Sequence, residues 1–246
     1  MLFMLFIPLL ASVVAPWVAV AQDVPGPYSC GPCLLQPGTD EMTLVVDHVS
    51  PVMATLEWGA VGEPMQRVEH SNPERHHIFE LTGLAPGCLY SYRISTNDQL
   101  DSGPREFRTL PVAPETYRII TVGDVRSQPA EWRRVSRRIV DDESDALFMI
   151  GTGDYPSDGR KYPLWILQFF RPARDLLARI PLWPAIGNHE ATRPAGSTME
   201  ENSKYFSLFE LPGNELWYRV EYHMLTLLIV DSNSHCDPSS EQYQWL

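Results

Sequence analysis

The sequence predicts an all-β sandwich followed by an α/β domain, and two observations lead to this fold class. Residues 24–111 contain short β-rich segments that Gly, Pro and Asn interrupt at close intervals, a pattern typical of antiparallel sandwiches. The next part contains apolar runs of about five residues at helix-length spacing, as in buried parallel strands of βαβ units. A proline-rich stretch at residues 110–114 is the predicted linker, so we expect domains at residues 22–111 and 112–246.

Residues 1–21 have the features of a secretory signal peptide. They are almost wholly apolar and end in Ala19-Val20-Ala21, a small-x-small cleavage pattern, before polar sequence begins at Gln22. A basic segment at the start is absent, so an uncleaved anchor is the alternative. We expect cleavage after Ala21 and a secreted or periplasmic protein. No later apolar run is long enough to span a bilayer, so we expect no stable membrane insertion of the mature chain.

The net charge of −12 and the pI near 5.0 bear on the partners of the protein. A groove that follows a nucleic-acid backbone needs clustered Lys and Arg, so the composition argues against nucleic acid as the main partner. An anionic substrate would have to be attracted locally, by metal ions or by a few arginines.

Within the predicted sandwich, residues 43–46, 53–58 and 90–94 are the expected strands. Residues 81–92 resemble the E–F corner of fibronectin type III-like sandwiches, in which a tyrosine hydroxyl binds the backbone. Trp58 is expected in the core. His76 and His77 are adjacent on a strand and should point to opposite faces, which argues against a shared metal. His48 and His70 show no partner pattern in the sequence.

Four cysteines are present. Cys30 and Cys33 have redox-motif spacing but lie among prolines rather than at a helix start, so a small structural disulfide or two capped thiols is favoured. Cys88 and Cys236 are either free or paired to each other, and the sequence leaves both alternatives open.

The second half should contain helices between its strands. Residues 127–141 are predicted as a helix with Pro129 in the first turn and an apolar face. That face consists of Trp132, Val135 and Ile139. Four arginines on the other side, at positions 133, 134, 137 and 138, are interpreted as a solvated face.

Further elements are expected towards the end of the chain. Residues 162–179 should form a helix broken at Pro172, and a polar loop should follow Glu190 as far as residue 203. Strands are expected at residues 216–220 and 224–230, the second with an exposed edge or face, and a helix should begin at residue 242.

Three of the apolar runs lead into clusters of polar side chains. The clusters are Gly123-Asp124-Val125-Arg126, Gly153-Asp154 and Gly187-Asn188-His189-Glu190. Ligands bind beyond the carboxyl ends of parallel strands, where these clusters should meet. Carboxylate, amide oxygen and imidazole suit di- or trivalent metals.

The order of these clusters suggests roles for a two-metal centre. We expect Asp154 to bridge two ions, with Asp124 on one and Asn188 on the other. His189 is the candidate for protonating a leaving alkoxide. Glu190 is expected to orient its neighbours without touching metal.

The motifs GDVR, GTGDYPSDG and GNHE, in this order, resemble the calcineurin-like metallophosphoesterases. With the preceding sandwich, the chain is similar to the purple acid phosphatase branch. The resemblance implies a fibronectin type III-like domain followed by an αββα metallophosphoesterase sandwich. It also implies two Fe, Mn or Zn ions, a phosphate ester substrate, and hydrolysis of monoesters, or of diesters, by attack of a metal-bound hydroxide.

The sequence departs from the family pattern at three places. Purple acid phosphatases have a tyrosine ligand where this chain has Ser157, and the nearby tyrosine is Tyr155. Other members have a histidine ligand where this chain has Arg126, which suits either a phosphate contact or a structural ion pair. The later histidines of the family, in a GHxH-type motif, are absent from the sequence. We therefore expect an incomplete phosphatase domain and an inactive chain. The alternative is a non-catalytic exported binding protein with a degenerate phosphatase half.

Overall fold

The computed structural model describes residues 28–97, 99–100, 104–192 and 203–246. The predicted signal peptide lies outside the described residues, as does most of the predicted polar loop after Glu190. Among the described residues, no helix is long and apolar enough to cross a membrane.

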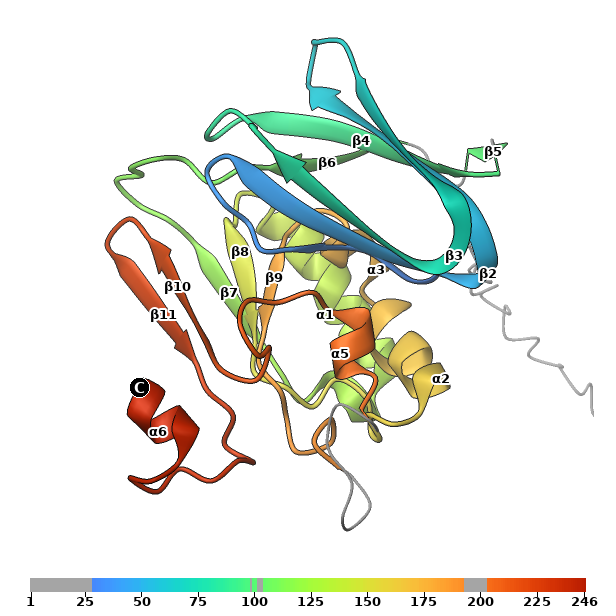
Figure 1. The fold of residues 1–246 in the computed structure, drawn as a ribbon. Helices are drawn as coiled ribbons and strands as arrows, with labels where there is room; N and C mark the ends of the chain where they lie inside the picture. The colour runs from blue at the N-terminus through green and yellow to red at the C-terminus, as the bar shows by residue number, and fades with distance from the viewer. Residues whose placement is uncertain (1–27, 98, 101–103, 193–202) are drawn as a thin grey trace, which may run out of the picture.

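The first part of the described chain forms a curled antiparallel sheet (Figure 1). Its strands are β1 (Tyr28–Leu35), β2 (Glu41–Ala60), β3 (Gln66–Thr82), β4 (Leu89–Thr96), β5 (Gln99–Leu100) and β6 (Arg105–Arg108). The pairing of β2 with β3 is irregular between Asp47 and Val52, where both strands bend. Before the bend β2 also pairs with β1, and after it β2 pairs with β4. The strands β2 and β3 therefore stay paired on both sides of the bend, whereas the other neighbour of β2 changes from β1 to β4.

This curled sheet differs from the expected sandwich in one respect. The segments predicted as separate strands at residues 43–46 and 53–58 belong to a single strand, β2, so the two layers are joined by bent strands. The predicted corner is present, since Oη of Tyr90 accepts a hydrogen bond of 2.7 Å from the Ala85 N–H. The expectation for Trp58 was wrong. Leu56 and Tyr92 are fully buried in the centre of this core, whereas Trp58 is half-buried against it.

The predicted parallel strands are confirmed. They are β7 (Ile119–Val122), β8 (Phe148–Gly151) and β9 (Leu182–Pro184), with β8 in the middle. Strand β9 also pairs with β1 at Leu35, so the two predicted parts share one sheet. They share a core as well, because Cys33 and Leu35 of β1 are buried together with Trp165 and Leu182.

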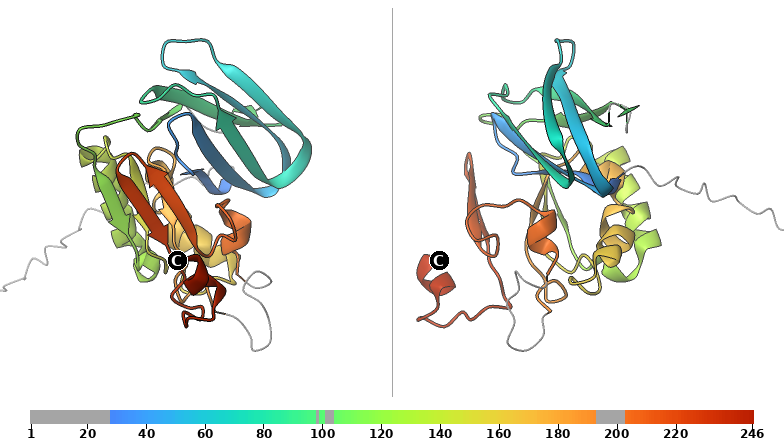
Figure 2. Two further views of the ribbon diagram at one scale, coloured as in Figure 1. Left: turned by 60° about the vertical axis from the view of Figure 1, so that its left-hand side comes forward. Right: turned by 45° about the vertical axis from the view of Figure 1, so that its right-hand side comes forward.

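Helices cover one face of the parallel strands (Figures 1 and 2). They are α1 (Pro129–Asp142), α2 (Tyr162–Leu164), the π-helical segment η2 (Trp165–Phe170) and α3 (Arg174–Leu177). The break at Pro172 and the start at Pro129 are as predicted. The predicted apolar face of α1 needs one correction. Val135 is 49% exposed, and Ser136 is buried in its place because its hydroxyl oxygen lies 2.9 Å from the Pro172 carbonyl oxygen.

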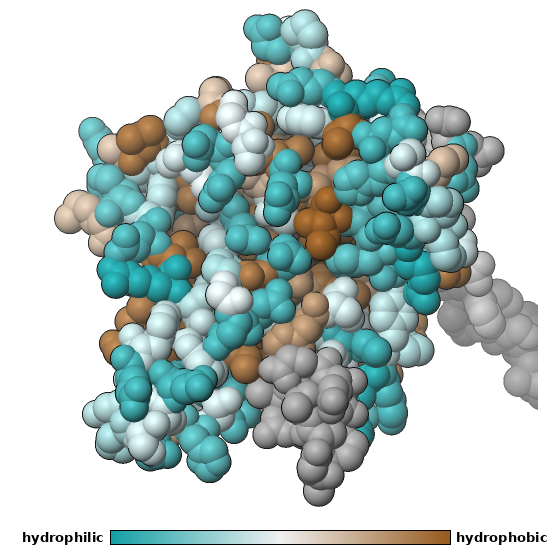
Figure 3. Space-filling view, in the orientation of Figure 1, coloured by the Kyte–Doolittle hydropathy of each residue, from teal (hydrophilic) through white to brown (hydrophobic). Residues whose placement is uncertain are grey.

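The other face of the strands is covered by the hairpin of β10 (Tyr218–Tyr222) and β11 (Leu225–Ile229). Tyr218 and Tyr222 pack on Trp183 and Phe148. As predicted, the second strand has an exposed side, and Figure 3 shows apolar side chains reaching the surface on the side where this hairpin lies. Leu228 of β11 is 46% exposed.

Two short helices complete the described chain. They are α5 (Tyr205–Leu208) and α6 (Glu241–Trp245), the second of which confirms the predicted terminal helix. The side chain of Gln242 holds α6 near the end of β11, since it accepts from the Asp231 N–H at 2.7 Å and donates to the Asp231 carbonyl at 2.9 Å.

The histidines of the curled sheet lie closer together than expected. His77 is buried and His76 is half-buried, as adjacent strand residues should be. However, Nδ1 of His70 lies 3.2 Å from Nδ1 of His77, and the rings of His48 and His77 are 5.4 Å apart. The bend in β2 and β3 brings these rings together, which the sequence did not indicate.

All four cysteines are free thiols, so of the alternatives that the sequence left open the structure has two thiols at Cys30 and Cys33 and unpaired Cys88 and Cys236. Cys30 and Cys33 are buried, and burial raises the pKa of both thiols. Their inaccessibility agrees with a packing role rather than a redox role.

Candidate active site

Two aspartates follow adjacent parallel strands and share an unusual backbone conformation. Asp124 follows β7 with a φ of 55°, and Asp154 follows β8 with a φ of 61°. Residues with a side chain adopt this left-handed region at a cost of roughly 1–3 kcal/mol, and such strain is concentrated at functional sites. The two carboxylates therefore meet at the carboxyl edge of the sheet, as the sequence predicted. This edge faces away from the curled sheet (Figure 1).

Arg126 joins these two carboxylates. It lies in η1 (Val125–Ser127), the 3₁₀ turn after β7. Its Nη1 is 2.5 Å from Oδ1 of Asp124 and 2.8 Å from Oδ2 of Asp154. The hydrogen bond to Asp124, together with the charge of Asp154, raises the pKa of Arg126. Nη1 of Arg126 thus contacts both carboxylates, so the two aspartates share the positive charge of one guanidinium group.

Glu190 is completely buried beneath the cluster. Its Oε2 accepts hydrogen bonds of 2.8 Å from the N–H groups of Asp154 and Gly187, and Oε1 accepts one of 2.9 Å from the Tyr155 N–H. Burial raises the pKa of this carboxyl to about 7, against the opposing effect of the three N–H donors. Glu190 thus links the turns that follow β8 and β9.

Gly187 leaves the space that this arrangement needs. A Cβ at this position would lie within 3.0 Å of the Asp154 nitrogen, the Asp154 carboxylate and Oε2 of Glu190. Only glycine permits these three groups to approach the backbone so closely.

His189 is positioned by two contacts. Its backbone N–H donates to Oδ1 of Asp154 at 3.1 Å, and its Nδ1 lies 2.7 Å from the carbonyl oxygen of Ser157. A carbonyl can only accept, so Nδ1 carries the proton in this contact. Nε2 is then the atom that can exchange a proton with a substrate.

Asn188 is the predicted ligand that the structure does not bring into the cluster. Asn188 is exposed. Within the described part of the chain, its side chain makes no hydrogen bond to Asp124 or Asp154. Among the described residues, no group of three or more His, Cys, Asp or Glu side chains could hold a metal ion. The carboxylates of Asp124 and Asp154 fit a metal in donor chemistry, but the described residues supply fewer donors than a two-metal centre needs.

Tyr155 cannot act as a metal ligand in this structure. The residue is fully buried, and its hydroxyl donates to the Ala185 carbonyl at 3.1 Å, on the core side of the strand. Burial raises the pKa of this hydroxyl well above its ordinary value. Ser157, at the family position, presents its backbone carbonyl to His189 instead.

Sequence reasoning missed that Arg126 contacts both aspartates at once. The GDVR spacing placed it near Asp124, but the contact with Asp154 depends on the pairing of β7 with β8. Sequence reasoning also gave no role to Gln168, whose side chain accepts from the Ser157 N–H at 2.6 Å. No local signal in the sequence indicates that contact.

The family model of the calcineurin-like phosphoesterases matches residues 117–244, whereas no curated protein sequence matches. The chain is similar to the solved structure of PhoD, with a TM-score of 0.62 and 14% identity over 85% of this chain and 52% of that one.

A second, weaker likeness is to the FN1–FN3 domains of chicken CNTN1, with a TM-score of 0.27 and 21% identity over 31% of this chain and 30% of that one. The chain spans about half of the PhoD structure, and that likeness shows the fold. The family match covers more than half of the present sequence and includes every residue of the aspartate cluster. The chain belongs to the calcineurin-like phosphoesterase family.

Proposed function

We propose that this protein is a metal-dependent phosphoric ester hydrolase that acts on phosphate monoesters, as acid phosphatases do. The observation that carries the proposal is the pair of aspartates, both in the left-handed conformation, whose carboxylates contact one positively charged atom. Strained carboxylates at the carboxyl edge of a parallel sheet are a suitable place for a cation and a phosphate group. Family membership supports the same reaction class.

Each residue of the cluster would have a separate role in the reaction. Asp124, Asp154 and Asn188 would hold two ions of Fe, Mn or Zn, which when bound supply a nucleophile near neutral pH and neutralise charge on the phosphate. Nε2 of His189 would protonate the leaving oxygen, because Nδ1 is engaged by the Ser157 carbonyl. Glu190 would keep the Asp154 backbone in place. Arg126 would contact a phosphate oxygen with the part of its guanidinium that the aspartates leave open.

The test is hydrolysis of an aryl phosphate with added manganese, iron or zinc, by the 246-residue chain and by its Asp154→Ala variant. The described residues form no group of three metal-binding side chains, so we expect slow turnover and weak metal binding. We still expect the Asp154→Ala variant to bind less metal and to lose activity by about 100-fold, in line with the loss of a charge-stabilising group. The matched control is Asp145→Ala, because Asp145 is 71% exposed and its one ion pair within the described ranges is with Arg118 at the surface.

Measurable turnover that is equal in the original chain and in the Asp154→Ala variant would contradict the proposed role of Asp154. Equal metal binding by the two as well would favour the non-catalytic alternative. An aryl phosphodiester assayed in parallel decides between monoester and diester preference.

We also propose that the protein is exported. It is supported by the apolar residues 1–20 and the Ala19-Val20-Ala21 site. We expect the exported protein to begin at Gln22 when its N-terminus is sequenced. Exported protein that still began at Met1 would refute cleavage.

A further inference from the structure

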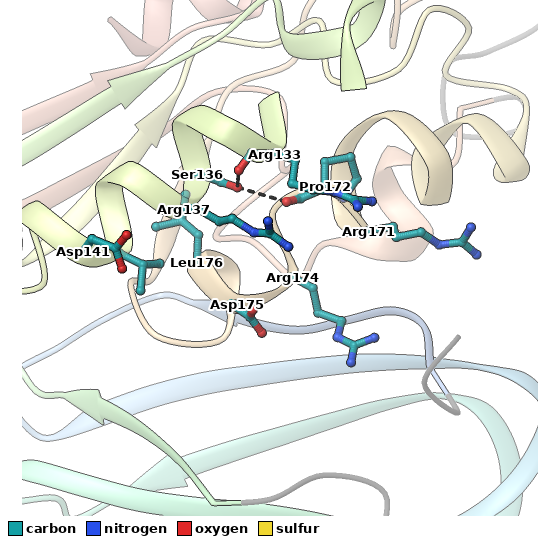
Figure 4. A pocket seen from close by; sticks show the side chains of 10 residues that line it. Arg133, Ser136, Arg137, Asp141, Arg171, Pro172, Arg174, Asp175 and Leu176 are labelled. Atoms are coloured by element: carbon teal, nitrogen blue, oxygen red, sulfur yellow. Dashed lines mark hydrogen bonds between the residues drawn. The ribbon is translucent and has the colours of Figure 1, made fainter. Parts of the chain in front are cut away.

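A cavity of about 240 Å³ lies between α1 and the segment that contains α3 (Figure 4). Arginines dominate its lining and come from both sides. They are Arg133 and Arg137 from α1, and Arg171 and Arg174 from the facing segment. Half of the arginine run predicted as a solvated face therefore also lines a cavity, where Arg137 is exposed and Arg133 is half-buried.

The cavity is separate from the candidate active site. Helix α1 begins after the carboxyl end of β7 and ends before the amino end of β8, so its last turns lie near the opposite edge of the sheet from the aspartate cluster. From α1 the cavity is lined by residues of the second turn onwards, from Arg133 to Asp141, and not by the first turn next to the aspartate cluster. It lies beside the curled sheet, since Arg105 of β6 approaches Asp175 to 3.9 Å.

The arginines of α1 fall into two groups by their partners. Arg134 pairs with Glu131 at 2.8 Å, and Arg138 pairs with Asp142, so these two are neutralised on the surface of their own helix. In contrast, Arg137 makes no ion pair within the described part of the chain. The same holds, among the described residues, for Arg171 and Arg174 on the facing segment.

The charge around the cavity is unbalanced. Leaving Arg133 out of the balance, the lining contains three arginines without an ion pair among the described residues, Arg137, Arg171 and Arg174. Of its two carboxylates, Asp175 approaches Arg105 and Asp141 remains, which leaves an excess of two positive charges. The whole chain has a net charge of −12, so this excess is local. Like charges gathered around a partly desolvated space repel one another, and a doubly negative ligand would relieve that repulsion.

The two sides of the cavity are held at a fixed separation. Ser136 is 2% exposed, and its Oγ lies 2.9 Å from the Pro172 carbonyl oxygen and 3.0 Å from the Arg133 carbonyl oxygen (Figure 4). This contact joins α1 to the facing segment, so the backbones that carry Arg137 and Arg174 are held in a fixed position relative to each other.

We infer that this cavity binds a phosphate dianion, either inorganic phosphate or the phosphate group of a small organic molecule. Guanidinium groups form paired hydrogen bonds with phosphate oxygens, and two negative charges match the excess of two positive charges. A space of about 240 Å³ accommodates a small anion. The inference is independent of hydrolysis, because the site lies away from the aspartate cluster and needs no metal.

The experiment measures binding of inorganic phosphate and of phenylphosphonate to the 246-residue chain by calorimetry, with EDTA present and ionic strength held constant with sodium chloride. Phenylphosphonate represents the organic source, and the tighter of the two ligands identifies which source the site prefers. We expect the Arg137→Gln, Arg174→Gln double variant to bind at least about tenfold more weakly, because each charge-assisted hydrogen bond contributes about that factor. The control variant, Arg134→Gln with Arg138→Gln, removes the same charge from the same region and should bind normally.

A further arm separates the two sites. Because Arg126 is itself proposed to contact phosphate at the aspartate cluster, the comparison concerns the binding that the Arg137→Gln, Arg174→Gln variant removes. Arg126→Gln should retain that binding, and its loss in Arg126→Gln would assign the anion to the aspartate cluster and overturn the inference. Unchanged binding by the Arg137→Gln, Arg174→Gln variant, or an equal loss in the control variant, would also overturn it. If the double variant fails to fold by circular dichroism, Arg137→Gln alone provides the same comparison, since that side chain is exposed and makes no ion pair with described residues.

Discussion

The backbone N–H of Asp154 donates a hydrogen bond of 2.8 Å to Oε2 of Glu190, a side chain that is completely buried. Through this contact the turn after β9 holds the turn after β8, and with it the carboxylate that contacts Arg126. Because one completely buried carboxylate accepts three N–H hydrogen bonds, the geometry of the cluster depends on that side chain.

Glu190→Gln should lower the free energy of unfolding by about 1–3 kcal/mol. The substitution preserves size but places an NH₂ group where Glu190 accepts hydrogen bonds, so at least one buried N–H loses its acceptor. Urea unfolding measures the change. Glu221→Gln is the matched control, because Glu221 is exposed and, in the part of the chain that the structure describes, pairs with Arg219 alone. It should cost under about 0.5 kcal/mol. Equal costs for the two variants would show that the three hydrogen bonds do not support the fold.

Gly187→Ala should destabilise the protein by roughly 2–4 kcal/mol and distort the aspartate cluster. The new methyl group would overlap the Asp154 backbone and Oε2 of Glu190, which are held by neighbouring structure and cannot move away freely. Gly62→Ala serves as the comparison. Gly62 has a φ of 93° and open space around it, so alanine there should cost only about 1 kcal/mol of backbone strain. A smaller cost at Gly187 than at Gly62 in urea unfolding would rule out the proposed crowding.

Stability should fall as the pH falls from about 6.5 to about 4, in part because of His48. Burial, together with the smaller effect of the nearby His77, lowers the pKa of His48 from 6.5 to about 4. In this range the unfolded chain binds a proton at His48 that the folded chain does not, so acid favours unfolding, by on the order of 2–3 kcal/mol. Unfolding measured across this range should show a shallower pH dependence in His48→Gln than in the original chain. His235→Gln, in a loop, should leave the slope as it was, and an unchanged slope in His48→Gln would exclude this origin.

Iron-loaded protein should lack a tyrosinate-to-iron absorption band in the visible spectrum. The hydroxyl of Tyr155 donates a hydrogen bond to the Ala185 carbonyl in the core, and the side chain of Ser157 contains no phenol. Tyr155→Phe should therefore leave the visible spectrum unchanged. A band that is present in the original protein and lost in Tyr155→Phe would show that this side chain reaches the metal.

Elements whose signals are local were predictable from the sequence. The three apolar runs gave β7, β8 and β9, and Pro129 marked the start of α1, because hydrophobic runs and proline act on their immediate neighbours. The expected face of α1 was wrong at Val135 because a contact with Pro172, distant in sequence, made the buried position of Ser136 favourable. The strands at residues 43–46 and 53–58 were predicted as separate because nothing local shows that β2 continues through its bend.

By itself, the sequence determined which residues end the parallel strands and therefore which side chains gather at one edge: Asp124, Asp154, His189 and Glu190. The carboxyl ends of parallel strands coincide whatever the side chains do, so strand order in the chain was enough. Only the tertiary structure decided that one guanidinium joins both aspartates. It likewise decided that Arg137 lines a cavity while its neighbour Arg138 is paired at the surface. These outcomes depend on the separation and rotation of whole elements, which long-range packing sets and residue spacing along the chain does not encode.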